Sequence, residues 1–122
     1  NERILSKYAY ILYEKGQYKE AIPILEQSFS LFPTAEKILD LGDAYKEVKV
    51  YGKAIECYRT ASYMLPAYVT PPYKLFCLYN ELGINDKAVE YAKRIDSMKA
   101  KVENRWVMNI KKEAKGFLQL QQ

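Results

Sequence analysis

Histidine is missing from the 122 residues of this chain. Because histidine is the commonest general base and the commonest metal ligand in proteins, its absence removes the most frequent routes to acid–base catalysis and to a metal site. The sequence also lacks a glycine-rich phosphate loop and a G-x-S-x-G nucleophile motif, and the neighbouring acids Asp40 and Asp43 have no metal-ligand spacing around them. We therefore expect a segment that is not an enzyme and that holds no cofactor and no metal ion.

Cysteine is nearly as rare, since the chain has only Cys57 and Cys77, too far apart for a C-x-x-C redox or zinc motif. We expect both to be small buried apolar residues. Apolar runs are short as well: the longest, such as residues 8–13, fall far below the roughly 20 residues that span a bilayer. The chain has no charged-then-apolar leader, and we expect it to be soluble. Because it does not begin with methionine, we expect a processed chain or a fragment.

Glycine and proline are scarce, at five each, and they separate stretches with a helical pattern. Apolar residues recur at spacings of three and four over residues 3–15 and over residues 18–31, with Gly16 between the stretches and Pro33 after them. Four residues then recur at one offset of 33: Tyr18, Ala21, Ile22 and Pro33 return as Tyr51, Ala54, Ile55 and Pro66. A looser third copy carries Ala88, Val89 and Gly83. Self-similarity at this period is typical of helical repeat proteins.

These repeats predict one domain over residues 1–122, with copies at about 2–34, 35–68 and 69–101. The last copy of a repeat array exposes an apolar face, and a helix at about 102–119 is predicted to cover it. We expect the only tryptophan to be buried there. The apolar face of this helix consists of Trp106, Ile110, Ala114, Phe117 and Leu118.

Residues 41–66, LGDAYKEVKVYGKAIECYRTASYMLP, resemble the tetratricopeptide repeat, with its L-G-x2-Y, A-x3-F and closing Pro; Tyr58 stands where the pattern has Phe. The resemblance implies an all-α fold, which is a right-handed solenoid of three helix-turn-helix repeats plus a capping helix. It also implies that the solenoid binds a protein or peptide in its concave groove. The first helix of each hairpin would line that groove, and the implied groove residues are Ser6, Tyr10, Tyr13, Leu39, Asp43, Lys46, Tyr73, Cys77 and Asn80. Some members clamp a terminal carboxylate with Lys and Asn on inner positions. The corresponding positions here hold Ser6, Tyr10, Leu39, Asp43 and Tyr73, so that activity is not expected.

The net charge of +4 is concentrated near the C-terminus, where residues 93–122 hold eight Lys and Arg against three acids. The predicted basic patch consists of Arg105, Lys111, Lys112 and Lys115. It is either an ordinary solvated helix face or a surface for an acidic partner or an anionic membrane.

The C-terminal half also resembles the soluble tail of bacterial O-antigen ligase or polymerase-like membrane proteins, particularly those of Bacteroidetes. The matching residues are Ala61, Ser62, Met64, Pro66, Pro72, Tyr73, Leu78, Tyr79, Lys101, Val102, Glu103, Ile110, Lys112, Glu113 and Ala114. This resemblance implies an interaction module of a glycan ligase or polymerase in lipopolysaccharide biosynthesis. The module would be attached to the inner membrane in the full-length protein. The basic tail and the unpaired cysteines favour the cytoplasmic over the periplasmic side. No nucleic-acid or small-molecule ligand is expected. The alternatives are a stand-alone adaptor without a membrane part and a catalytic or glycan-binding role for the segment itself.

Overall fold

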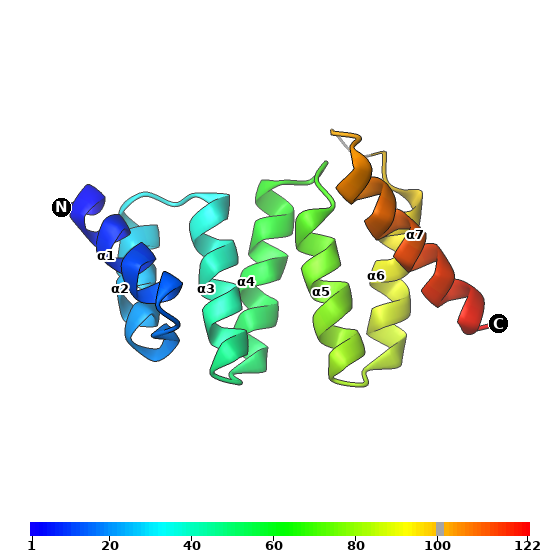
Figure 1. Cartoon of the computed structure of the whole chain (residues 1–122), viewed down its shortest axis with the longest axis horizontal. Coiled ribbons are helices and arrows are strands. Elements are labelled where there is room, and N and C mark those ends of the chain that lie inside the picture. The colour runs from blue at the N-terminus through cyan, green and yellow to red at the C-terminus, as the bar shows by residue number, and fades with distance from the viewer. Residues whose placement is uncertain (100–101) are drawn as a thin grey trace. The chain divides into compact units, whose positions relative to one another are not determined.

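The computed structural model describes residues 1–99 and 102–122, which form seven α-helices and no strand (Figure 1). The helices are α1 Glu2–Glu14, α2 Tyr18–Leu31, α3 Ala35–Glu47, α4 Tyr51–Met64, α5 Thr70–Glu81, α6 Asn85–Ser97 and α7 Arg105–Leu120. Residues 100–101, which end the third predicted repeat, lie outside the described residues. They include Lys101, one of the residues that match the ligase tail. No described helix is both long enough and apolar enough to span a bilayer.

Side-chain caps fix where several of these helices begin. The side chains of Asn1, Thr34 and Asn104 accept hydrogen bonds from the third backbone N–H of α1, α3 and α7. These amide donors have no partner within the helix, so each cap satisfies a group that would otherwise be left open.

The turn inside each hairpin is the same in all three copies. Gly16, Lys49 and Gly83 occupy the left-handed region, with φ of 76°, 66° and 74°. In each turn the next residue donates its N–H to the carbonyl five residues back, from Gln17 to Leu12 and, at the same spacing, in the other two turns. This pattern closes the first helix of the hairpin with a left-handed residue, a position that glycine adopts without steric cost. Lys49 is the one non-glycine residue with positive φ among the described residues.

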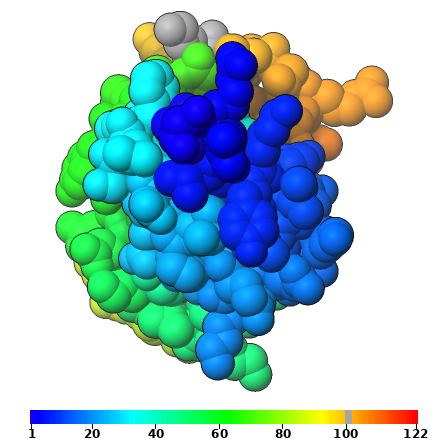
Figure 2. All heavy atoms as spheres, turned by 90° about the vertical axis from the view of Figure 1, so that its left-hand side faces the viewer, coloured from blue at the N-terminus to red at the C-terminus, as the bar shows by residue number. Residues whose placement is uncertain are grey.

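The described chain divides into two compact units, Asn1–Met64 and Leu65–Gln122. In the first unit α1 packs on α2, α2 on α3, and α3 on α4. Figure 2 looks onto this unit from the side of α1, where the dark-blue N-terminal atoms lie against light-blue and cyan atoms of α2 and α3. Its core consists of Ala9, Leu12, Ala21, Leu25, Ile38, Leu41, Ala44, Cys57 and Ala61.

Small residues allow close approach between α3 and α4. A β-carbon built on Gly42 would lie 2.7 Å from Cε1 of Tyr58, whose side chain is only 1% exposed. Helix α3 therefore lies against the tyrosine ring at a distance that only glycine permits.

The apolar stripe predicted on the first helix is divided in the structure. Ala9 and Leu12 are buried, whereas Ile4, Tyr8 and Ile11 are 65%, 51% and 49% exposed. Within the first unit α1 is an end helix, so only part of its circumference is packed.

In the second unit α5 packs on α6 and α6 on α7. Tyr79 and Tyr91 stack with ring centroids 5.8 Å apart, and Phe76 meets Phe117 of α7 edge-on at 5.0 Å. The buried residues of α7 are Val107, Ile110 and Ala114.

The expectation that the tryptophan is buried is wrong, because Trp106 is 50% exposed. It follows Arg105 in the first turn of α7, one position before the buried Val107. Since successive helical residues are rotated by about 100°, Trp106 lies at the edge of the packed face rather than at its centre.

Candidate functional site

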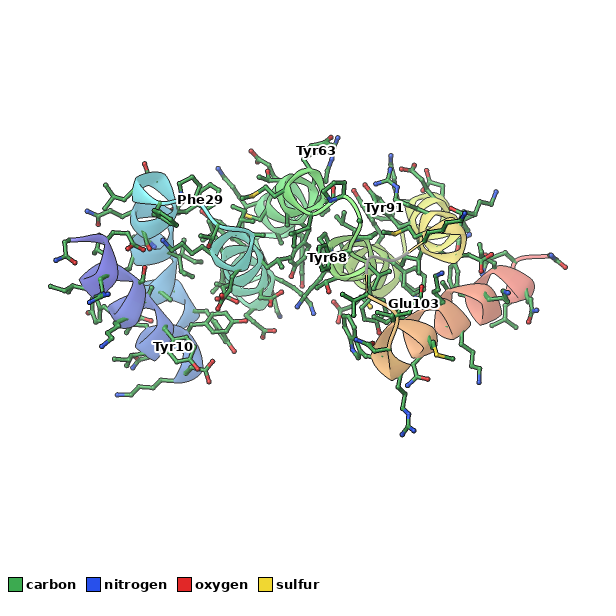
Figure 3. All side chains as sticks on the ribbon, turned by 90° about the horizontal axis from the view of Figure 1, so that it is seen from above. Tyr10, Phe29, Tyr63, Tyr68, Tyr91 and Glu103 are labelled. Carbon is green, nitrogen blue, oxygen red and sulfur yellow. The ribbon has the colours of Figure 1, made fainter. Side chains whose placement is uncertain are left out.

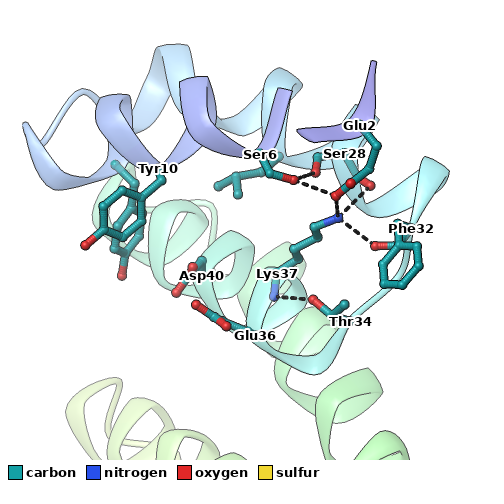
Figure 4. Close-up of a pocket in the computed structure, with 11 residues that line it drawn as sticks. Glu2, Ser6, Tyr10, Ser28, Phe32, Thr34, Glu36, Lys37 and Asp40 are labelled. Atoms are coloured by element: carbon teal, nitrogen blue, oxygen red, sulfur yellow. Dashed lines mark hydrogen bonds and ion pairs between the residues drawn. The ribbon is translucent and has the colours of Figure 1, made fainter. Parts of the chain in front are cut away.

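A cavity of about 300 Å³ lies among α1, α2 and α3 in the first unit (Figure 4). We call it the α1–α3 cavity. It is lined by Glu2, Ser6, Tyr10, Tyr13, Leu25, Ser28, Phe32, Thr34, Glu36, Lys37 and Asp40.

One end of the cavity is organised by Lys37, whose side chain is only 14% exposed. Its ammonium lies 2.7 Å from Oε1 of Glu2 and donates to the backbone carbonyls of Ser28 and Phe32 at 3.2 and 2.8 Å. It also lies 5.3 Å from the ring centroid of Phe32. The hydrogen bond from Lys37, followed by one from Ser6, holds the pKa of Glu2 below its usual value. The charge of Lys37 is therefore engaged within the protein, and it joins α3 to α1 and to the end of α2.

Two serines complete this end. Ser28 is fully buried, and its Oγ lies 2.9 Å from the Oγ of Ser6, which also donates to Glu2 at 2.7 Å. The buried hydroxyl thus has a partner, which avoids the cost of leaving a polar group unsatisfied.

The other end carries two aromatic side chains. Tyr10 is 57% exposed, and in Figure 3 it lies on the opposite side of the α1–α2 pair from Phe29. Tyr13 meets the ring of Tyr18 edge-on at 5.4 Å and donates its hydroxyl to Asp43 at 3.1 Å. Burial, reinforced by the charge of Asp43, raises the pKa of Tyr13 above its ordinary value. A neutral, fixed Tyr13 and a more exposed Tyr10 therefore form the aromatic part of the cavity.

The hydrogen bond of Tyr13 is one of two that the Asp43 carboxylate accepts from tyrosines on other helices. Tyr58 of α4 donates to the other oxygen of Asp43, so one carboxylate joins α1, α3 and α4. Burial and this hydrogen bond raise the pKa of Tyr58 as well. The predicted groove residue Asp43 therefore has a structural role, since it holds Tyr13, which lines the cavity.

The six groove residues predicted in the first unit occupy different places. Ser6, Tyr10 and Tyr13 line the cavity, Leu39 packs against the core, and Lys46 is half-buried. Sequence reasoning missed the following lining residues: Glu2, Leu25, Ser28, Phe32, Thr34, Glu36, Lys37 and Asp40. Spacing along the first helices gave no sign of Ser28 and Phe32, because they belong to the end of a second helix.

The three groove residues predicted in the second unit lie on α5. Tyr73 donates to Glu113 of α7 at 3.1 Å and meets the ring of Trp106 edge-on at 6.3 Å. A hydrogen bond with Cys77, followed by burial, raises the pKa of Tyr73. Cys77 is half-buried, and Asn80 is exposed.

The four predicted basic residues all lie on α7. Lys111 is 3.8 Å from Glu103, and Lys115 is 3.9 Å from Asp96. Arg105 and Lys112 are exposed. Two of the four charges are therefore partly compensated by acids of the same unit.

Two observations on the described residues concern metal-ligating and nucleophilic side chains. The described residues contain no group of three or more His, Cys, Asp or Glu that could hold a metal ion. Burial raises the pKa of the Cys57 thiol to about 11, which keeps it protonated at neutral pH and unsuited to nucleophilic attack.

Comparison with known proteins agrees with this fold. The tetratricopeptide repeat family matches residues 2–34. No curated protein matches the chain significantly.

Solved structures resemble nearly the whole chain. PcrH in complex with the chaperone binding region of PopD has a TM-score of 0.78 and 18% identity, covering 97% of this chain and 88% of that chain. PcrH from Pseudomonas aeruginosa alone gives a TM-score of 0.78 and 18% identity over 98% of this chain and 89% of its own. The Sgt2 tetratricopeptide domain from Aspergillus fumigatus gives 0.73 and 16% identity over 97% of this chain and 79% of its own. The predicted fold class, an all-α tetratricopeptide solenoid, is confirmed by these similarities.

Proposed function

We propose that this chain is a non-catalytic protein-binding module, and that the α1–α3 cavity receives part of a peptide segment of its partner. The observation that carries the proposal is a cavity of about 300 Å³ with aromatic residues at one end and a fixed polar network at the other. Binding pockets are typically concave, largely apolar, and furnished with a few well-placed polar groups. The structure of PcrH with the chaperone binding region of PopD is consistent with this use of the fold.

Partner contacts are also proposed outside the cavity, separately for each unit. In the first unit they are Leu39, Asp43 and Lys46, with Asp43 acting through the tyrosines that it holds. In the second unit they are Tyr73, Cys77 and Asn80 of α5.

The test is selection of binding peptides from a random library displayed on phage, followed by measurement of their affinity for two variants. Tyr10→Ala removes the exposed ring from the cavity and is expected to weaken binding by about tenfold, which corresponds to about 1.4 kcal/mol. The matched control is Tyr63→Ala, since Tyr63 is 75% exposed on α4 and lies outside the cavity (Figure 3). This control should bind like the unchanged protein. Equal losses in both variants, or no loss in either, would exclude the cavity as the binding site.

The narrower proposal concerns the protein that carries this module. We propose that it is an O-antigen ligase or polymerase-like membrane protein of cell-surface glycan assembly, on the sequence resemblance of the C-terminal half. The stand-alone adaptor is equally consistent with the fold. A coding sequence with multiple apolar spans immediately upstream of Asn1 supports the first proposal, and an upstream sequence without them supports the adaptor.

In the membrane-attached case, α7 would meet anionic lipid through the exposed Arg105 and Lys112 on the cytoplasmic side, where basic segments and free thiols are usual. Co-sedimentation with vesicles of anionic lipid at low salt tests this contact. Retention that disappears in the double variant Arg105→Gln and Lys112→Gln supports it, and absence of retention at low salt contradicts it.

A further inference from the structure

We propose that the outer face of α1, formed by Ile4, Tyr8 and Ile11, receives a further helix that precedes Asn1 in the full-length protein. This helix packs on α1 as α2 packs on α3, and it belongs to a further repeat. The inference is independent of the peptide proposed to bind in the α1–α3 cavity. It is supported by the exposure of the face, by the covered counterpart of this face on α3, and by its small size.

The outer face of α1 is apolar and open to solvent. Ile4, Tyr8 and Ile11 are all exposed, and they lie at spacings of four and three, so they form one stripe along the helix. The cavity lies on another side of α1, because Ser6 and Tyr8 are two positions apart and are rotated by about 200°. Figure 2 looks onto this end of the first unit, where the dark-blue atoms of α1 lie at the surface. The stripe is therefore separate from the cavity and available to a partner.

The same face of α3 is covered. At the repeat offset of 33 the three positions of the stripe become Lys37, Leu41 and Ala44. Leu41 and Ala44 are buried in the core that α2 and α3 share, and Lys37 donates to the carbonyls of Ser28 and Phe32 at the end of α2. The chain itself thus shows what covers this face of a first helix, which is the second helix of the preceding repeat.

Helix α2 also shows the chemistry of the proposed helix. It has 14 residues, and its buried side chains are Ala21, Leu25 and Ser28, again at spacings of four and three. Residues 32–34 join it to α3. We therefore expect the segment immediately before Asn1 to form a helix of similar length, with small and branched apolar side chains at this spacing, followed by a short linker.

The apolar character of this face is unusual for the end of a repeat array. Terminal repeats ordinarily have a polar outer face, because an exposed apolar face promotes association. In the second unit α7 packs on α6, and its exposed residues include Arg105 and Lys112. The exposed stripe of α1 is therefore typical of a repeat in the interior of an array.

The size of the stripe favours a helix of the same polypeptide over a second copy of the chain or a separate protein. Stable interfaces between proteins involve roughly 20–30 residues on each side. The stripe offers only Ile4, Tyr8 and Ile11 as large apolar side chains. A helix that is held by a short linker has a high effective concentration, so it docks through a much smaller contact.

The experiment compares the 122-residue chain with a longer chain that includes the roughly 34 residues encoded immediately before Asn1, the length of one repeat. The extension should raise the urea midpoint by roughly 1 M, because each repeat is stabilised by its neighbours. It should also slow amide hydrogen exchange in α1 by about tenfold or more, because α1 is then covered on both sides.

The variant Tyr8→Lys tests the position of the docked helix. It places a charge at the centre of the stripe, so it should remove most of the gain in midpoint and in protection from exchange. In the 122-residue chain it should change the midpoint little, since Tyr8 is exposed there. The matched control is Tyr63→Lys, the same replacement at a residue that is 75% exposed on α4, and it should leave the gain intact.

Four outcomes would overturn the inference. They are a coding sequence with no helix-forming segment before Asn1, an extension that neither stabilises the chain nor protects α1, a gain that persists in Tyr8→Lys, and dimerisation of the 122-residue chain that protects α1. The last result, detected by light scattering and hydrogen exchange, would assign the stripe to a second copy. All four leave peptide binding in the α1–α3 cavity intact, because that site lies on another side of α1.

Discussion

The ammonium of Lys37 lies 2.7 Å from a carboxylate oxygen of Glu2, thirty-five positions away in the sequence. This contact joins the start of α3 to the start of α1 and closes one end of the α1–α3 cavity. It follows that the cavity depends on a long-range interaction as well as on the repeat pattern.

Replacement of Lys37 by methionine should destabilise the protein. The variant keeps most of the apolar stem but removes the ammonium that donates to the carboxylate of Glu2 and to the carbonyls of Ser28 and Phe32, of which the Ser28 carbonyl still accepts the N–H of Phe32. Loss of the hydrogen bonds from this largely buried ammonium costs roughly 1–2 kcal/mol in the free energy of unfolding, which urea denaturation measures. Lys7→Met, on the exposed surface of α1, should change it little. Equal stabilities for the two variants would contradict the role given to Lys37.

The contribution of Glu2 should depend on pH. Its pKa is lowered in the folded state, mainly by the hydrogen bond from Lys37, from an ordinary value of 4.5. The ionised form is therefore favoured by folding, and the stabilisation is present above pH 4.5 and is lost as the pH falls through the lower folded-state pKa. Glu2→Gln should thus be less stable than the unchanged protein at about pH 7 and equally stable at about pH 2. A difference in urea midpoint that stays constant over this range would contradict the assignment.

Lys49→Gly should stabilise the protein. Lys49 has φ of 66° at a turn position where the other two copies have glycine. A residue with a β-carbon pays roughly 1–2 kcal/mol in the left-handed region, so we expect a gain of about 1 kcal/mol after allowing for the greater freedom of glycine in the unfolded chain. The reverse change in the first copy, Gly16→Lys, should cost a similar amount. Thermal unfolding of the two variants checks the sign, and a loss of stability in Lys49→Gly would show that the lysine side chain has a compensating role.

Two Gly→Ala substitutions in helices should have opposite effects. At Gly42 the new β-carbon would lie 2.7 Å from the buried ring of Tyr58, whose hydroxyl is held by Asp43. Overpacking costs about 1–3 kcal/mol, which exceeds the gain of up to about 1 kcal/mol in helix propensity. At Gly116 of α7 nothing lies within 4 Å, so alanine should stabilise by about 0.5–1 kcal/mol. Urea denaturation of both variants is the check, and stabilisation by Gly42→Ala would contradict the close packing of α3 on α4.

Local pattern predicted the helices well. Residues 18–31 form α2 with the predicted bounds, and the first helix is shifted by one residue, from 3–15 to Glu2–Glu14. Helix boundaries of this kind depend on nearby glycine, proline and capping residues, all of which are visible in the sequence.

The cavity could be predicted only in part. Ser6, Tyr10 and Tyr13 follow from the face that α1 presents, and they line the cavity. Lys37 could not be found in this way, since its offset partner in the first copy is the apolar Ile4 and its role depends on reaching across to another helix.

Trp106 shows a different limit. The predicted apolar face of α7 included residues at its edge as well as at its centre, and periodicity alone does not tell the two apart. In the packed structure Val107, which was not on the predicted face, is buried. Trp106 is half exposed, and its ring contacts the ring of Tyr73.

The central claim is that a peptide side chain occupies the α1–α3 cavity. The most direct measurement is the set of intermolecular nuclear Overhauser effects between a bound peptide, selected for affinity, and the side chains of the protein. The account predicts contacts from one apolar side chain of the peptide to Tyr10, Tyr13 and Leu25 together. Contacts only to residues outside the cavity, with none to these three, would contradict it.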